Sequence, residues 1–225
     1  QATLTDLDTS VAMEMTLSQE GQKVSVVSDM DLKCSGINTP DMKYATDSAM
    51  TVSALGITQQ LDMQTYYYDG WCYTDMIGEK YKYATDLSTI MNSLQQNMNT
   101  SNLTAAQMLD LSMTEENGQT VLAFTADPTQ MNEQVKEALG LIGDQLASLG
   151  EIAMDVHDVH GTYTINKDGY YTAAHVIMSY EMSILGISIP VDADIHMTFN
   201  NPGDPVNVEL PDLSAYNEIE LPEAD

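Results

Sequence analysis

Histidine and aspartate side chains alternate along the last third of the chain in a pattern that could bind a metal ion. Two-residue turns at Asp168-Gly169 and Leu185-Gly186 would join three long strands there, because glycine in such dipeptides suits the positive φ angles of a tight hairpin. Side chains alternate between the two faces of a strand, so this register places Thr162, His175 and His196 side by side. The next two rows on the same face contain His160, Ile177 and Asp194, and then Asp158, Ser179 and Asp192.

The chemistry expected of this patch is the binding of zinc, nickel or copper, because these ions take imidazole and carboxylate ligands. Cross-strand neighbours lie about 5 Å apart at Cβ, and diagonal neighbours about 7 to 8 Å. The candidate metal ligands are therefore His160, His175, Asp194 and His196. The alternative is solvated surface charge, which such patches in acidic proteins more often represent, since an open sheet offers no second shell to orient the rings.

The sequence contains none of the common catalytic or nucleotide-binding motifs. A nucleophile elbow, a P-loop, a dinucleotide fingerprint and a zincin motif are all absent. A hydrolase would also need a convergent set of catalytic residues, which the pattern does not provide. We therefore expect no catalytic residue, no enzyme activity and no cofactor.

The dipeptide Asp69-Gly70 favours a two-residue turn and lies between two strand-forming runs, so the sequence predicts a central hairpin over residues 59–83. Its register pairs Tyr68 with Trp71 and Met63 with Met76. Strands over residues 11–17, 23–34 and 42–54 precede it, which makes about six consecutive antiparallel strands. The later part of the chain predicts a second hairpin around Asn117-Gly118 and three long strands over residues 152–166, 170–184 and 187–199.

Two helices are predicted between these blocks of strands. One begins after the cap Asp86, and the other begins at Asp127-Pro128 and runs to about Gly150. Both strand blocks have a continuous apolar face that only these amphipathic helices can cover. We expect one α+β domain over residues 1–225, in which a strongly curved antiparallel sheet wraps the helices on its concave face. Residues 201–225 would form an extended acidic tail, with residues 206–208 extending a sheet edge.

The net charge of the chain restricts the partners that it can bind. The formal net charge is −27, with 34 acidic and 7 basic residues, so the chain should repel nucleic acids and anionic membrane surfaces.

Cys34 and Cys72 should face inward with two strands between them, roughly 14 Å apart at about 4.8 Å per strand. Two alternatives remain open for these cysteines: a disulfide bond, if the sheet is strongly curled, or two buried free thiols.

Several of these features together resemble a family of exported lipoproteins from Gram-positive bacteria. They are the two strand blocks with helices between them, the hairpin Tyr-Tyr-Tyr-Asp-Gly-Trp-Cys-Tyr at residues 66–73, and the segment Val-Glu-Leu-Pro-Asp-Leu at residues 208–213. The family has no known function, and its assumed fold is similar to the LolA/LppX/LprG group of lipoprotein and lipid carriers. The resemblance covers residues 3–210 and implies an incomplete barrel with a hydrophobic cavity between sheet and helices.

The resemblance and the sixteen methionines together predict a non-enzymatic carrier or sensor for an apolar or amphiphilic, lipid-like ligand. Methionine is flexible and polarizable, so a methionine-rich surface adapts to irregular apolar ligands. The expected ligand-binding residues are Met63, Met76, Leu94, Val135, Ile142, Val191, Ile195 and Met197. The alternative is a cell-surface interaction module whose interior is fully packed. We expect a monomer outside the cytoplasm, held at the outer face of the cell membrane by an N-terminal lipid anchor outside this sequence.

Overall fold

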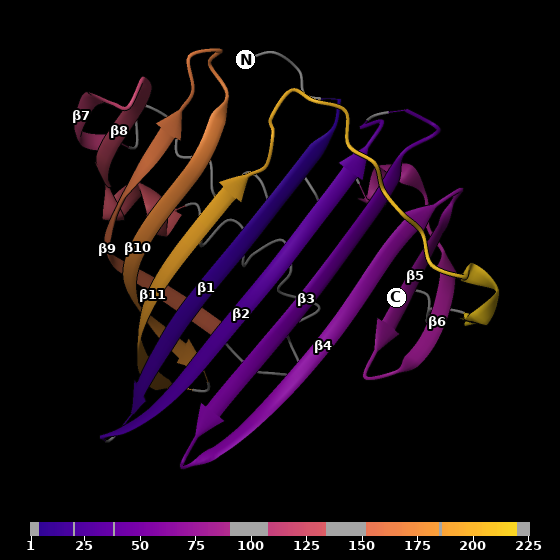
Figure 1. Ribbon diagram of the computed structural model, residues 1–225. Coiled ribbons are helices and arrows are strands. Elements are labelled where there is room, and N and C mark those ends of the chain that lie inside the picture. Colours follow the sequence, from indigo (N-terminus) through magenta and orange to yellow (C-terminus); the bar gives the residue numbers. More distant parts are fainter. Residues whose placement is uncertain are drawn as a thin grey trace.

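The computed structural model describes residues 5–19, 21–37, 39–90, 108–133, 152–184 and 186–219. Its strands form one sheet in the order β12-β6-β5-β4-β3-β2-β1-β11-β10-β9-β8-β7. Figure 1 shows this sheet as a single open, strongly curved layer. The strands are β1 Leu7–Gln19, β2 Gln22–Ser35, β3 Lys43–Ala54, β4 Ile57–Tyr68, β5 Trp71–Met76, β6 Glu79–Ala84, β7 Met108–Glu116, β8 Gln119–Ala126, β9 Ile152–Ile165, β10 Tyr171–Ile184, β11 Ile187–Phe199 and β12 Asn217–Glu218.

The sheet consists of two antiparallel meanders that meet at β1 and β11. Strands β1 to β6 form one meander and β7 to β11 the other, as the short connections predicted. The two halves join because β1 pairs with β11 from Thr9 opposite Phe199 to Leu17 opposite Val191. This pairing was not predicted from the sequence. It matches the apolar faces of two strands that lie at opposite ends of the chain.

Turn chemistry fixes the register of the hairpins. Tyr68 lies opposite Trp71 and Met63 opposite Met76 around Asp69-Gly70, as predicted. In β9 a bulge shifts the pairing between Ser179 and Tyr180. The side chain of Asn132 fits this bulge: its Oδ1 accepts from the N–H of Val156 at 2.6 Å, and its Nδ2 donates to the carbonyl of Val156 at 3.1 Å. A side chain from the second helix therefore replaces ladder bonds that the bulge removes.

Both helices start on the concave face of the sheet. Residues 87–90 and 128–133 are helical, and Asp86 caps the first helix by accepting from the N–H of Thr89 at 2.8 Å. Leu87 and Ile90 pack against the cluster of Leu7, Leu32, Cys34 and Met42, and Met131 packs against that of Ala126, Val156 and Val159. The sheet thus wraps the described helix starts as predicted. No helix among the described residues is long and apolar enough to cross a membrane.

The segment after β11 crosses the opposite, convex face of the sheet (Figure 1). The N–H of Asn200 donates to the carbonyl of Asp8 at 2.8 Å, and the N–H of Val206 donates to the carboxylate of Asp6 at 3.1 Å. The prediction that residues 206–208 extend a sheet edge is wrong, because Val206 bonds a side chain rather than a strand. Instead β12 pairs with β6 in parallel. We call residues 200–216 the strap.

The two cysteines are free thiols, both buried. Tyr44 and Tyr67 lie between them in one row across β2 to β5, so two strands separate them as predicted. Burial, with a smaller contribution from the carboxylate of Asp6, raises the pKa of Cys34 to about 12. The thiol therefore stays protonated at neutral pH.

Candidate functional site: the concave face and a histidine pair

The concave face carries a row of residues that runs in register across ten strands. Consecutive members are cross-strand partners, and five of the ten are methionines. At about 4.8 Å per strand the row measures roughly 43 Å along the curved sheet. Its members, from β5 to β7, are Met76, Met63, Ser48, Met30, Val11, Met197, Ala174, Tyr163, Leu122 and Met113.

The structure brings three of the predicted ligand-binding residues into this methionine row. Met63 and Met76 are direct partners, and Met197 lies four strands away from Met63 in the same row. Ile195 lies on the next row, opposite Met13. Val191 lies still further along β11 and is buried. The other three predicted residues, Leu94, Val135 and Ile142, lie outside the described residues.

Polar groups lie directly beside the methionine row. The next row on the concave face contains Thr9, Thr46 and Thr74, and all three are buried. The hydroxyl of Thr46 hydrogen-bonds Tyr44. By contrast, the hydroxyl of Thr9, in a residue only 5% exposed, has no hydrogen-bond partner in the described part of the chain. A buried hydroxyl without a partner is uncommon in a folded protein.

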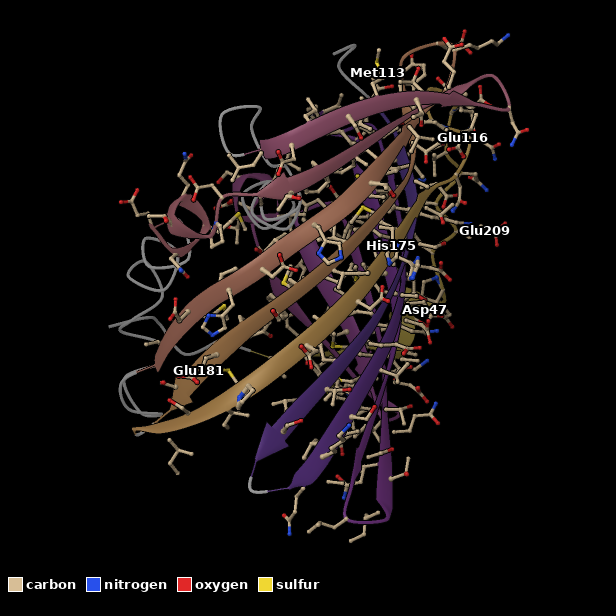
Figure 2. The ribbon with its side chains drawn as sticks, turned by 90° about the vertical axis from the view of Figure 1, so that its left-hand side faces the viewer. Asp47, Met113, Glu116, His175, Glu181 and Glu209 are labelled. Atoms are coloured by element: carbon tan, nitrogen blue, oxygen red, sulfur yellow. The ribbon has the colours of Figure 1, made fainter. Side chains whose placement is uncertain are left out.

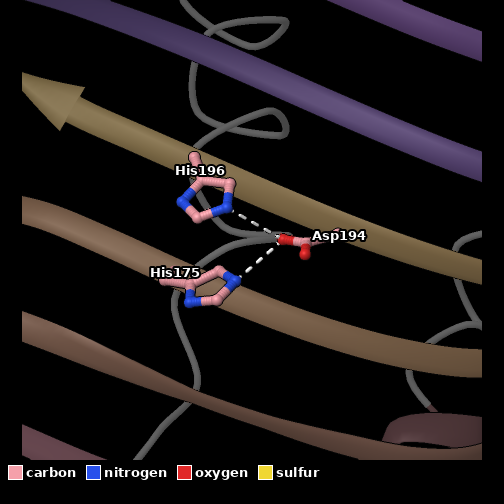
Figure 3. Close-up of side chains that lie close together, drawn as sticks. All are labelled: His175, Asp194 and His196. Atoms are coloured by element: carbon pink, nitrogen blue, oxygen red, sulfur yellow. Dashed lines mark hydrogen bonds and ion pairs between the residues drawn. The ribbon is translucent and has the colours of Figure 1, made fainter.

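On the convex face, His175, Asp194 and His196 form one compact cluster (Figure 3). The Nε2 atom of His175 lies 2.8 Å from Oδ1 of Asp194, and the Nε2 atom of His196 lies 3.1 Å from the same oxygen. The two rings stack with their centroids 4.0 Å apart. One ligand atom from each residue lies within 4.8 Å of the others. Both nitrogens therefore point toward a single carboxylate oxygen.

The predicted register explains this cluster. His175 pairs with His196 across β10 and β11, and Ile177 pairs with Asp194 one row away. These rows lie on the face opposite Val176, which packs beside Met131 in the core of the concave face. The fourth predicted ligand, His160, is not part of the cluster. Its Nδ1 lies 2.9 Å from the carboxylate of Asp158 on the same strand, because Ile177 separates it from Asp194.

Carboxylates surround the histidine cluster. Glu14 is the cross-strand partner of Asp194, and Asp192 lies two residues before it on the same face of β11. Asp29 lies one strand beyond Ala12, the partner of His196. The neighbourhood of the two imidazoles is therefore strongly negative, which favours a cation there.

A second hollow on the convex face was missed in the sequence. The strap and β1 to β4 enclose a groove of about 870 Å³, and Figure 2 shows Asp47 and Glu209 on this side of the molecule. Its lining includes five carboxylates, from Asp8, Asp31, Asp47, Asp204 and Glu209, and one lysine, Lys33. The four prolines after residue 200 indicated an extended segment, but nothing local indicated which face it would cross.

Comparison with known proteins places the chain in a family without assigning it an activity. No curated protein matches it. Among solved structures, the crystal structure of LprF from Mycobacterium bovis matches with a TM-score of 0.43 and 12% sequence identity, covering 93% of this chain and 90% of LprF. The fold assignment rests on the strand order and register described above. The sequence model of the family of unknown function DUF6612 matches residues 41–213, which is most of the chain, so this protein belongs to that family.

Proposed function

We propose that this protein is a non-enzymatic carrier or sensor outside the cytoplasm that binds an apolar or amphiphilic, lipid-like ligand on its concave face. The observation that supports this best is the methionine row. Its Met63 and Met76 pair remains 37% and 36% exposed although it lies on the face that packs the core. A domain without a ligand tends to pack such side chains to near-crystalline density, whereas ligand sites keep a preformed apolar surface.

The row of threonines supports an amphiphile rather than a plain hydrocarbon. The unpartnered hydroxyl of Thr9 lies one row away from Val11 and Met30, so an apolar chain along the methionine row would bring its polar group within reach of Thr9. A ligand that supplies a hydrogen bond there would remove the cost of a buried unsatisfied group.

A probe titration with designed variants tests this function. Native mass spectrometry of the purified protein and titration with a fluorescent fatty acid should both detect binding. Replacing Met63 and Met76 together by glutamine should weaken the probe at least tenfold, since two apolar contacts become polar. The control Gln64→Ala changes the convex side of the same strand and should bind normally. Absence of probe binding to the wild type, or equal binding by the double variant, would support the packed-module alternative.

Metal binding at His175, Asp194 and His196 is a second candidate function, favoured by the geometry of the cluster. Ligands about 2.0 to 2.1 Å from a zinc ion lie roughly 2.9 Å apart at right angles and about 3.4 Å apart in a tetrahedron. The two nitrogen–oxygen distances of 2.8 and 3.1 Å agree with such an arrangement. Two imidazoles and one carboxylate suit zinc, nickel or copper, while calcium would need more oxygen ligands.

Calorimetry with zinc distinguishes a metal site from two ordinary hydrogen bonds to Asp194. The wild type should bind one equivalent, and His175→Ala should abolish this binding because one imidazole and one carboxylate remain. The matched control is His160→Ala, which removes a histidine that also pairs with a carboxylate but lacks a second ring. No heat from the wild type, or equal heat from wild type and His175→Ala, would rule out the site.

A further inference from the structure

The hairpin turns of this sheet differ between its two ends. At one end the turns at Asp69-Gly70 and Asn117-Gly118 have a polar residue before glycine. At the other end, the β3–β4 turn is Leu55-Gly56 and the β5–β6 turn is Ile77-Gly78 (Figure 1). All four turns place both residues at positive φ, where aspartate and asparagine are the usual choices. The end with Leu55 and Ile77 therefore uses the wrong residues for its turn type.

Neither packing nor backbone preference explains these two residues. Leu55 has a φ of +53° and Ile77 a φ of +55°, and a β-branched residue in this region is a genuine outlier. Their side chains are 74% and 75% exposed, so the strain is not offset by contacts within the protein. Strain that persists at an exposed position points to a function for the side chain.

Two of the hairpins at this end carry no charge beside their turns, whereas Asp75, Glu79 and Lys80 flank the Ile77-Gly78 turn. Residues 53–61 and 186–191 contain no ionisable side chain, although the whole chain carries a net charge of −27. Ile57 and Ile187 add two more exposed apolar side chains there. The β3–β4 hairpin is polar but uncharged beside its turn, as in the paired hydroxyls of Ser53 and Thr58.

We propose that Leu55, Ile57, Ile77 and Ile187, the apolar tips, dock this protein on an uncharged lipid surface such as a zwitterionic bilayer. The tips lie on three hairpins rather than in one patch, with Leu55 and Ile57 on the same one, which suits insertion of single side chains between lipid headgroups better than contact with a protein. A zwitterionic surface avoids the repulsion that an anionic surface would exert on a chain with a net charge of −27. Docking on the lipid surface would allow the protein to take up its lipid-like ligand, and this part rests on the proposed function.

Flotation with phosphatidylcholine vesicles tests the docking surface. The wild type should float with the vesicles at low and high salt alike, because insertion of apolar side chains is not screened. The double variant Leu55→Asn/Ile77→Asn should bind at least tenfold more weakly. It should also melt higher, by about 2 to 4 °C or more, since asparagine tolerates positive φ. The control Asn117→Leu makes the reverse change at the polar end and should lower the melting temperature without changing flotation.

The following flotation and melting results would overturn the docking proposal. The wild type failing to float, the double variant floating equally well, or the double variant melting lower would each show that the tips do not serve lipid contact. Stronger flotation with vesicles that contain phosphatidylserine would show an electrostatic cause instead. Binding of the fluorescent fatty acid without vesicles is measured in parallel. If the wild type floats with the vesicles but does not bind the fluorescent fatty acid, the proposed function is overturned and the docking surface still stands.

Discussion

Replacing Thr9 by valine should make the protein more stable and a poorer binder. The hydroxyl of Thr9 is buried without a hydrogen-bond partner among the residues that the structure describes, and an unsatisfied buried hydroxyl costs about 1 to 3 kcal/mol. Valine has nearly the same shape, so the apolar neighbours Leu32 and Phe199 should close around a methyl group without a cavity. We expect the free energy of unfolding to rise by about 1 to 2 kcal/mol, allowing for imperfect fit.

The assay is urea denaturation of ligand-free protein, followed by titration with the fluorescent fatty acid. The control is Thr46→Val, the same substitution one strand beyond Leu32. It removes a hydroxyl that does have a partner, Tyr44, and should lower the free energy of unfolding by about 1 kcal/mol. Opposite signs for the two variants are the expected result. If Thr9→Val is as destabilising as Thr46→Val, or if it leaves the affinity for the probe unchanged, then the hydroxyl of Thr9 does not hydrogen-bond the ligand.

Three further results are expected. A Cβ atom on Gly161 would overlap the backbone carbonyl oxygen of His175, so Gly161→Ala should separate β9 from β10 and cost about 2 to 5 kcal/mol in urea denaturation. A cost below 1 kcal/mol would contradict this close approach. Asn132→Ala leaves the bulge at Val156 without its side-chain partners and should cost about 1 to 3 kcal/mol by the same measurement; an unchanged free energy would mean that water replaces Asn132. Burial raises the pKa of Cys34 and of Tyr44 to about 12, so the stability held by their neutral forms is fully present below pH about 9 and is lost as pH rises toward 12; a flat stability profile from pH 9 to 12 would refute it.

Local turn chemistry made much of this fold predictable. The dipeptides Asp69-Gly70 and Leu185-Gly186 determine which residues pair, so the Met63 and Met76 pair and the His175 and His196 pair follow from the sequence. Near Asp168-Gly169 the turn is longer than predicted and a shift between Tyr171 and Ala173 compensates for it. The register at His175 is therefore right although the turn is not.

Long-range features left no comparable local signal. The pairing of β1 with β11 depends on apolar faces that many strands share. The strap follows from side-chain contacts to Asp6 and Asp8, which no periodicity encodes. The bulge at Val156 was missed because its partner, Asn132, belongs to a helix. That the hydroxyl of Thr9 lacks a partner within the described ranges follows only from the three-dimensional positions of its neighbours.

The joint between β1 and β11 also decides when this protein can finish folding. The first strand of the chain must wait for the last long one, because Thr9 pairs with Phe199, while the hairpins on either side can form from neighbouring residues. Such distant pairing is slow. Until β11 arrives, β1 has an unpaired edge that can add strands from other molecules. A chain cut before residue 187 should therefore aggregate.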